Sequence, residues 1–155
     1  MESQAQTVAG LWRRLSRWPG GRWLFSRVFG WFVPYSASIG ARIEVLDPGY
    51  CRTTLRDRRR VRNHLDSIHA VALVNLGELT SGLAMTMALD PGIRGIVTAI
   101  GAEYQHKARG RLTAEARVVV PEVTEPVDTR IETVITDRSG AEVCRVHTIW
   151  RLARR

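Results

Sequence analysis

The sequence predicts a single α+β domain in which one long helix is wrapped by a curved antiparallel sheet of five to six strands. The chain has 155 residues, of which 45% are hydrophobic and 25% charged, as expected for one ordinary folded domain. Apolar residues recur at helical spacing over residues 66–89, and they alternate every second residue in segments on both sides of this helix. Because short connections join these segments, one antiparallel sheet covering the helix is the economical arrangement.

Residues 1–36 are predicted to form a helical arm that precedes the main domain at residues 37–155. A first helix ends at the Pro-Gly-Gly run 19–21, and a second helical piece, residues 23–33, ends at Pro34. In the first helix, apolar positions have helical spacing and arginines fall between them: Val8, Leu11, Trp12, Leu15 and Trp18, with Arg13, Arg14 and Arg17.

The composition of the arm is compatible with two interpretations. Four of the five tryptophans lie in it, and no acidic residue occurs between Glu2 and Glu44. Tryptophan and arginine on opposite faces of a helix suit contact with a membrane surface, or a lid over a pocket. The plainer alternative is an arm packed on its own domain or on a partner subunit, because most amphipathic helices in small proteins cover a core.

The next segments predict a β-hairpin and then the long helix. Residues 39–45 and 51–55 alternate around the turn at 47–49, and the basic run at 57–60 reads as a solvated loop. Asp66 or Ser67 is expected to cap the helix, and Asp90-Pro91-Gly92 ends it. No apolar run approaches the length of a membrane span. The apolar side of the predicted helix over residues 66–89 consists of Ile68, Val71, Ala72, Leu76, Leu79, Leu83 and Met87.

Four more strands are predicted after the helix. Residues 96–104 are rich in isoleucine, valine and threonine. In residues 112–120, apolar residues alternate with Thr113, Glu115 and Arg117. Residues 130–135 and 144–152 alternate on either side of the turn at 137–140.

The net charge of +8 calls for an anionic partner: nucleic acid, an anionic membrane surface, or a phosphate-bearing molecule such as coenzyme A. Lys107 is the only lysine, so arginine supplies nearly all of the positive charge. Cys51 and Cys144 are far apart and predict neither a disulfide framework nor a zinc site. The sequence has no signal-peptide pattern, and we expect a cytoplasmic protein without a metal or a resident cofactor.

The polar residues around the start of the long helix are the candidate chemical groups. Asn63 and His69 precede or begin the helix, and Glu78 interrupts an otherwise apolar run. A carboxylate in such a run is either turned to water or held in a pocket, where its pKa rises and it becomes a candidate base or nucleophile. The amides of Ala70 and Val71 at the helix start favour an oxyanion.

These residues resemble the motif of the hotdog-fold acyl-CoA thioesterases of the PaaI-like group. In that family the His of a His-Gly-Gly sequence is the sixth residue after an Asn, and Asp or Glu is the ninth residue after the His. Asn63, His69 and Glu78 have the same spacings, whereas Ala70-Val71 replaces Gly-Gly. The similarity covers about residues 38–152. The arm together with Asn63 and a helix Glu is similar to uncharacterised hotdog proteins classed under DUF4442.

The resemblance implies hydrolysis of an acyl-CoA thioester by a homodimer or a dimer of dimers. Glu78 would activate water or act as the nucleophile, and Asn63 would hold the water or the carbonyl across the dimer interface. His69 and the amides of Ala70 and Val71 would polarise the thioester oxygen. Coenzyme A phosphates, as part of the substrate, would meet these basic residues: Lys107, Arg109 and Arg111.

Two other functions compete with hydrolysis. Because Ala70-Val71 replaces Gly-Gly, the same fold could hold an acyl-CoA or a fatty acyl group without turnover. Specific nucleic-acid binding rests on charge alone, since the sequence has neither a base-reading basic helix nor a stacking strand.

Overall fold

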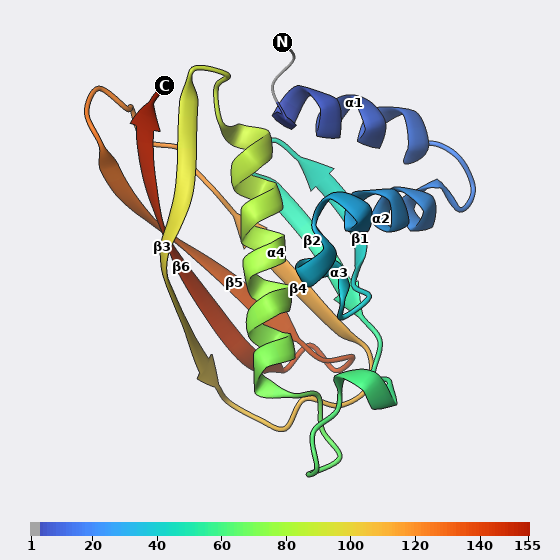
Figure 1. Cartoon of the computed structure of the whole chain (residues 1–155). Helices are drawn as coiled ribbons and strands as arrows, with labels where there is room; N and C mark the ends of the chain where they lie inside the picture. The colour runs from blue at the N-terminus through green and yellow to red at the C-terminus, as the bar shows by residue number, and fades with distance from the viewer. Residues whose placement is uncertain (1–3) are drawn as a thin grey trace.

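A computed structural model describes residues 4–155 as one curved sheet with a long helix in its concave face (Figure 1). The strands are β1 (Arg42–Asp47), β2 (Tyr50–Leu55), β3 (Ile93–Tyr104), β4 (Leu112–Arg117), β5 (Val127–Thr136) and β6 (Glu142–Arg154). The helices are α1 (Gln4–Leu15), α2 (Gly21–Phe32), α3 (Pro34–Ala37) and α4 (Ala70–Ala88), with a 3-10 turn η1 (Arg59–Val61).

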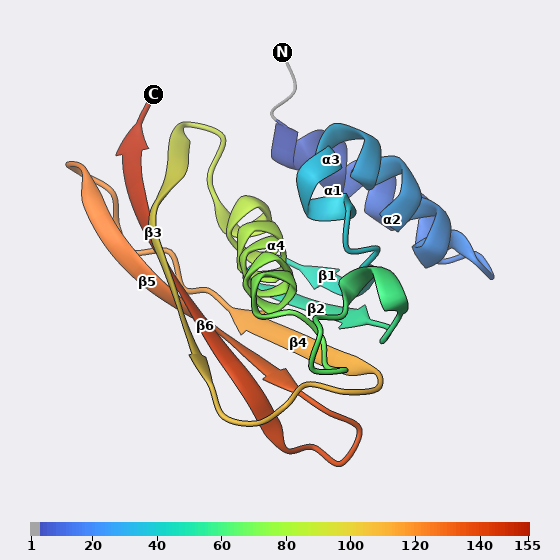
Figure 2. The ribbon, with the colours of Figure 1, turned by 60° about the horizontal axis from the view of Figure 1, so that its bottom comes forward.

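All strand pairs are antiparallel, and the order across the sheet is β1-β2-β4-β5-β6-β3. The sheet wraps around α4, as Figure 2 shows when the molecule is seen nearly along that helix. The predicted fold class and the predicted hairpin are therefore confirmed. β1 and β3 are the two edges of the sheet, so each has one side without a strand partner in this chain.

The alternation predicted for the first strand is interrupted by a bulge. The pairing of β1 with β2 shifts between Ile43 and Val45. As a result Ile43 and Leu46 are buried, whereas Val45 is only half-buried. The strict period over residues 39–45 was therefore the wrong expectation for this edge.

The start of α4 differs from the prediction. Asp66 and Ser67 are not its caps: His69 is the N-cap, and its Nδ1 accepts a hydrogen bond from the Val71 amide at 3.1 Å. Asp66 instead has a left-handed backbone with φ 56°.

Backbone hydrogen bonds explain this delayed start. The Ile68 amide donates to the Ala108 carbonyl and the His69 amide donates to the Val61 carbonyl, both at 2.8 Å. These bonds fix residues 61–69 as a loop tied to its neighbours, so the helix begins only after the second of them.

α4 is buried on most of its circumference. By length and mean hydropathy it is the one helix within residues 4–155 that could span a membrane, but 61% of that stretch is buried against the rest of the domain. It is therefore the central core helix. Its buried residues are Ala72, Leu73, Asn75, Leu76, Gly77, Leu79, Thr80, Ser81, Leu83, Ala84 and Met85.

Gly77 marks the closest approach of α4 to the sheet. A β-carbon at this position would lie 2.4 Å from Val146 Cβ on β6, a distance that real side chains do not reach. Thr133 Oγ1 on β5 donates to the Gly77 carbonyl at 3.0 Å. The helix is thus held against β5 and β6 by a small residue and one hydrogen bond to its backbone.

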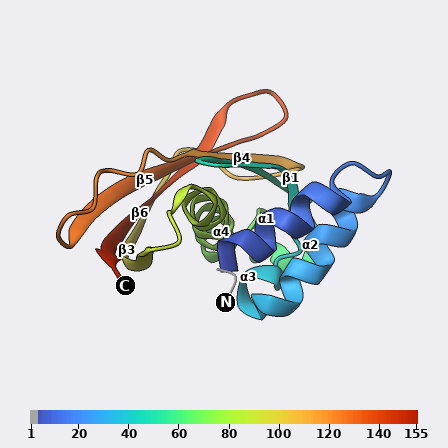
Figure 3. The ribbon, with the colours of Figure 1, turned by 90° about the horizontal axis from the view of Figure 1, so that it is seen from above.

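The arm packs on its own domain. Trp12 of α1 meets Phe25 of α2 edge-to-face at 5.0 Å between ring centroids, and both are buried in the core together with Leu79 and Leu83 of α4. Seen from above, α1–α3 lie together on the side of α4 away from β3 (Figure 3). The plainer interpretation of the arm thus holds for its inner face.

Both cysteines are free and buried in the sheet. Burial raises the pKa of the Cys51 thiol far above its ordinary value, and it raises the pKa of Cys144 to about 11. Neither thiol is therefore appreciably ionised at neutral pH.

The close contact at Gly77 yields a stability prediction. We expect Gly77→Ala to lower the free energy of unfolding by about 1–3 kcal/mol, because the added methyl group forces α4 away from Val146. Gly82 on the same helix is the matched control: a β-carbon there would be 3.6 Å from Trp150 Cζ2, an ordinary contact. Gly82→Ala should be neutral or stabilising by about 0.5–1 kcal/mol. Urea denaturation of both variants checks this, and equal effects would contradict it.

Candidate active site

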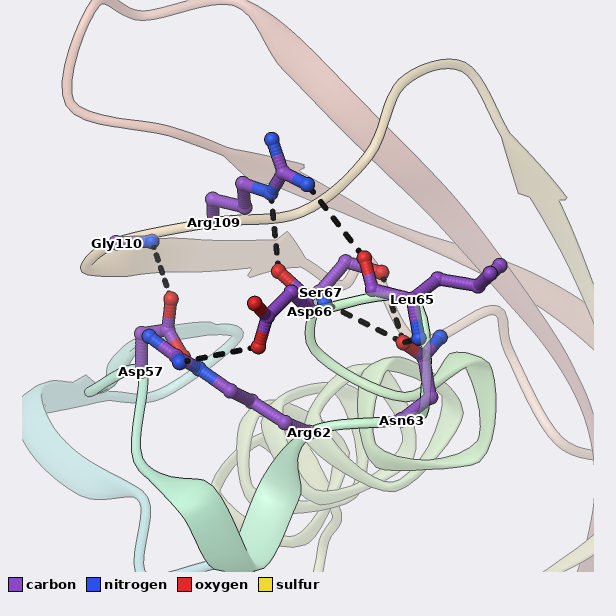
Figure 4. A network of polar contacts seen from close by, with 8 residues as sticks. All are labelled: Asp57, Arg62, Asn63, Leu65, Asp66, Ser67, Arg109 and Gly110. Carbon is purple, nitrogen blue, oxygen red and sulfur yellow. Dashed lines mark hydrogen bonds and ion pairs between the residues drawn. The ribbon is translucent and has the colours of Figure 1, made fainter.

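A network of polar contacts holds the loop before α4 (Figure 4). Asp57 accepts from Arg62 Nε at 2.6 Å and from the Gly110 amide at 2.9 Å. The Arg62 hydrogen bond lowers the pKa of Asp57. Arg109 donates through Nε to the Asp66 carbonyl at 2.9 Å, and its Nη2 points to the Leu65 carbonyl. The β3–β4 turn and the loop leading to the helix are therefore fixed relative to each other.

Asn63 stabilises this same loop. Its Oδ1 accepts from the Leu65 amide at 2.9 Å, and from the Ser67 amide and hydroxyl at 3.3 Å each. The Asn63 side-chain nitrogen takes no part in these hydrogen bonds. The residue therefore closes a turn through its oxygen and offers its NH₂ group as a donor.

The two candidate amides at the start of α4 differ. The Val71 amide donates to His69 Nδ1, so it is already used within the chain. The structure gives no acceptor within residues 4–155 for the Ala70 amide. Tyr104 Oη at the end of β3 donates to the Ala70 carbonyl at 3.3 Å and so lies beside this helix start. The Ala70 N–H is accordingly the free donor at the positive end of the α4 dipole.

Glu78 lies on the side of α4 that the sheet leaves uncovered. It is half-buried, and its carboxylate has no hydrogen bond or ion pair in the part of the chain that the structure describes. Burial alone raises the pKa of Glu78 above the ordinary value of 4.5. An ionised carboxylate with no compensating donor is a strong proton acceptor, as a general base requires.

A chain of hydrogen bonds positions an indole ring beside Glu78. Trp150 Nε1 donates to Thr148 Oγ1 at 3.1 Å, Thr148 Oγ1 donates to Ser81 Oγ at 3.2 Å, and Ser81 Oγ donates to the Glu78 carbonyl at 3.0 Å. A β-carbon built on Gly82 would lie 3.6 Å from Trp150 and 3.7 Å from Glu78 Oε1. The carboxylate and the indole therefore border the same space above Gly82.

Exposed apolar side chains surround the open side of α4. Val71 on the helix is 54% exposed, and Ile100 and Tyr104 on β3 are 45% and 49% exposed. Val97, Ile100 and Tyr104 pair with buried residues of β6. Paired residues share a face, so these three side chains lie on the inner face of the sheet. An apolar surface thus runs from the helix start along β3, next to the free edge of the sheet.

The predicted catalytic residues do not meet within one chain. Asn63 and His69 lie at the start of α4, whereas Glu78 lies nine residues further on. On a helix this separation is about 13 Å along the axis. One thioester group cannot contact both ends of such a span.

The three basic residues expected near coenzyme A phosphates have different surroundings. Lys107 is exposed, and Arg109 uses two of its nitrogens on the loop carbonyls. Arg111 lines a groove with Arg56 and Arg58. The basic run 57–60 was predicted to be a solvated loop. Nothing in the sequence indicates that Arg56 and Arg58 share a groove with Arg111, because the segments are far apart in the chain.

Two aromatic residues, Tyr104 and Trp150, also border the candidate site. The structure places Tyr104 at the helix start and Trp150 beside Glu78. The aromatic that ends the strand 96–104 was the only sequence signal for the first of them. No group of three or more His, Cys, Asp or Glu residues suited to a metal ion occurs within residues 4–155.

Comparisons with known proteins agree with this architecture. Residues 21–152 match the family described as "Domain of unknown function (DUF4442)". The solved structure of the structural-genomics protein APC5556 is 27% identical with a TM-score of 0.84, covering 96% of this chain and 99% of that one. The comparison with curated proteins found no similar sequence.

Two further structures carry functional descriptions of their own. PA5026 from Pseudomonas aeruginosa, described as a protein of unknown function and probable thioesterase, is 25% identical with a TM-score of 0.74, covering 92% of this chain and 96% of that one. The thioesterase HI1161 from Haemophilus influenzae is 16% identical with a TM-score of 0.68, covering 77% and 82%. The expected hotdog fold is confirmed.

The environment of Glu78 gives a pH-dependent stability prediction. Because burial raises its folded-state pKa, ionisation of Glu78 opposes folding at neutral pH, and this cost disappears as the pH falls through the folded pKa toward the unfolded one. We expect Glu78→Gln to melt higher than wild type at about pH 8, with an advantage that shrinks toward about pH 4. Differential scanning calorimetry of both proteins measures this.

The matched control is Glu125→Gln, in an exposed loop between β4 and β5 without an ion pair among the residues that the structure describes. It should leave the melting temperature nearly unchanged at both pH values. A Glu78→Gln variant that is less stable than wild type at about pH 8 would show that the carboxylate is stabilised rather than desolvated.

Proposed function

This chain belongs to the DUF4442 family, and from that premise we propose that it hydrolyses an acyl-CoA thioester at a site formed between two hotdog subunits. The observation that carries the proposal is Glu78: a half-buried carboxylate with a raised pKa, no partner among the described residues, and an open apolar surface beside it. The thioesterase descriptions of two similar structures, PA5026 and HI1161, support the reaction class.

A second copy of the chain accounts for the distance between the catalytic groups. A carbonyl bound at the start of α4 lies about 13 Å from Glu78 of the same helix. If two chains face each other about a two-fold axis with their α4 helices antiparallel, the helix start of one meets the middle of the other. Each site then uses Glu78 from one subunit and Asn63, His69 and Ala70 from the other.

The free edge of β3 and the apolar surface beside it support this assembly. β3 has 12 residues and one side without a strand partner. An edge of this length that carries Ile96 and Ile100 would be prone to aggregation unless another chain covers it. Pairing of two β3 edges in a dimer satisfies its backbone groups and buries the open side of α4.

The proposed reaction is a water attack on the thioester carbonyl. Glu78 takes a proton from water while the oxygen forms a bond to the carbonyl carbon. The Ala70 amide at the α4 start stabilises the negative oxygen of the tetrahedral intermediate, and the Asn63 amide group donates to the water or to the carbonyl. The C–S bond then breaks, and the coenzyme A thiolate takes up the proton. Direct attack by the Glu78 carboxylate, with an anhydride hydrolysed afterwards, uses the same residues.

Coenzyme A phosphates are proposed to contact the β3–β4 turn. Lys107 is exposed there, and Arg109 is already oriented by its bonds to the loop before α4. A guanidinium held in this way loses little conformational freedom when it binds a phosphate. Arg111 extends the positive charge from this turn toward β2.

One observation favours a second function, the binding of acyl-CoA or a fatty acyl group without turnover. The Val71 amide is occupied by His69 Nδ1, and Ala70 and Val71 carry side chains where the resembling enzymes have glycine. A site with one free amide stabilises an oxyanion less than a site with two. Thiol release from acyl-CoAs separates hydrolysis from binding.

We expect Glu78→Gln to lower kcat/KM for acyl-CoA hydrolysis by about 100-fold to 10,000-fold, because the amide cannot accept the proton from water. For wild type, kcat/KM should fall on the acidic side with a midpoint above the ordinary glutamate pKa of 4.5. Release of free thiol from short, aromatic and long acyl-CoAs measures both. Glu125→Gln serves as the control.

A protein that binds coenzyme A but releases no thiol from any of these substrates, in wild type and variant alike, would refute the hydrolase and support the binding module. Equal activity of wild type and Glu78→Gln would remove Glu78 from the mechanism.

Ile100→Lys tests whether the site needs two subunits. A lysine on the inner face of β3 would place a charge in the proposed interface, so we expect a monomer with thiol release reduced at least as far as in Glu78→Gln. Size-exclusion chromatography with light scattering gives the mass, and circular dichroism verifies the fold. Val119→Lys, at a position that is 89% exposed after β4, should stay dimeric and active. A fully active Ile100→Lys monomer would contradict the shared site.

A further inference from the structure

A groove lined by arginines lies between α2 and the β1 edge of the sheet. Its volume is about 450 Å³, and no Asp or Glu lines it. Arg42 faces Glu44 at 3.4 Å, whereas the other arginines of the groove have no ion pair within residues 4–155. The positive charge of the groove is therefore largely uncompensated. Its arginines are Arg27, Arg42, Arg56, Arg58, Arg60 and Arg111.

One of these arginines is held against the backbone. Gly40 has φ 67°, and a β-carbon there would lie 1.8 Å from Arg60 Nη2. The same nitrogen points to the Ile39 carbonyl at 3.4 Å. Because the guanidinium rests where a side chain would otherwise be, Arg60 is oriented toward the groove before any ligand binds.

Aromatic side chains border the groove and continue beyond it. Trp23 and Trp31 of α2 line it and are 57% and 92% exposed. Outside the groove, Trp18, Phe32 and Tyr35 are 73%, 76% and 73% exposed. The inner face of the same arm is buried in the core, whereas its outer side keeps these aromatic groups in water, uncovered by other residues within 4–155.

We propose that this face of the arm docks on an anionic phospholipid surface. Arg27, Arg56, Arg58 and Arg60 bind headgroup phosphates, and the indole rings of Trp23 and Trp31 enter the interfacial layer beside them. Arginine pairs with phosphate bidentately, and tryptophan favours the boundary between headgroups and acyl chains. Residues 3–43 contain no acidic side chain, so no negative side chain of α1–α3 opposes this contact.

Two alternative occupants fit less well. A soluble phosphate compound would fill the groove but would leave Trp18, Phe32 and Tyr35 exposed. A second copy docked here about a two-fold axis would bring arginine-rich faces together, which like-charge repulsion disfavours. The groove borders β1, and the edge proposed for the dimer is β3 at the other end of the sheet, so docking and dimerisation are compatible.

The test is flotation of the full chain with vesicles. We expect binding to vesicles of phosphatidylcholine and phosphatidylglycerol, weak binding to phosphatidylcholine alone, and loss of binding as salt is raised. Arg56→Ala and Arg58→Ala should each lower the partition coefficient about fivefold. Arg138→Ala, on the exposed β5–β6 turn and without an ion pair among the described residues, is the matched control and should have no such effect.

The tryptophans are tested separately. Trp31→Ala should weaken vesicle binding more than Trp31→Phe, and the tryptophan emission of the wild type should shift to the blue on anionic vesicles. Glu78→Gln should bind vesicles as the wild type does, so loss of hydrolysis and loss of docking are distinguishable.

Three outcomes would overturn the proposal. The first is no binding to anionic vesicles. The second is binding of soluble adenosine 3',5'-bisphosphate that depends on Arg56 and Arg58 in a protein that ignores vesicles, which would make the groove a soluble-phosphate site. The third is a change of oligomeric mass in Trp31→Ala, which would make this face a contact between copies.

Discussion

At Gly77 the central helix lies so close to β6 that a methyl group has no room beside Val146. This contact fixes the rotation of α4 about its own axis, since the glycine face has to meet the sheet. Successive residues of a helix turn by about 100°, so Glu78 is directed away from that contact and toward the side that the sheet leaves open. The carboxylate is half-desolvated without being sealed in the core. The core contact thus determines which helix residue can reach a substrate.

The same helix separates the groups that the proposed reaction uses. Its start offers the Ala70 amide, and its middle offers Glu78. Because these groups are about 13 Å apart along the helix axis, side-chain movements within one chain cannot bring them together. Tyr104 of β3, the strand with the free edge, contacts the helix start through the Ala70 carbonyl. Packing inside the subunit therefore fixes the surfaces that the second copy in the proposed dimer would meet.

Much of the fold could be predicted from the sequence because strand and helix periods are local patterns. The hairpin, the long helix and the four later strands depend on alternation or helical spacing within single segments. The start of α4 could not be predicted in the same way. Asp66 and Ser67 are good capping residues, but they lie in a loop that is held by hydrogen bonds from the Ile68 and His69 amides to the Ala108 and Val61 carbonyls. The bulge in β1 likewise depends on pairing with β2.

The candidate site likewise has features that one segment of sequence predicts and features that depend on the folded sheet. The spacing of Asn63, His69 and Glu78 was visible in the sequence, since it follows from one segment. The position of Trp150 and the meeting of Arg56, Arg58 and Arg111 depend on strands that come together only in the sheet.

The burial of both cysteines has a chemical consequence for any thioester that this protein binds. Exchange of an acyl group from coenzyme A onto a protein thiol needs an accessible thiolate, and Cys51 and Cys144 offer none because burial holds their protons in place. The chain therefore cannot store an acyl group on sulfur. Self-acylation of the kind used by acyl-transfer enzymes with a cysteine nucleophile is therefore disfavoured at both thiols, and the proposed transfer of an acyl group has to use oxygen, from water or from Glu78.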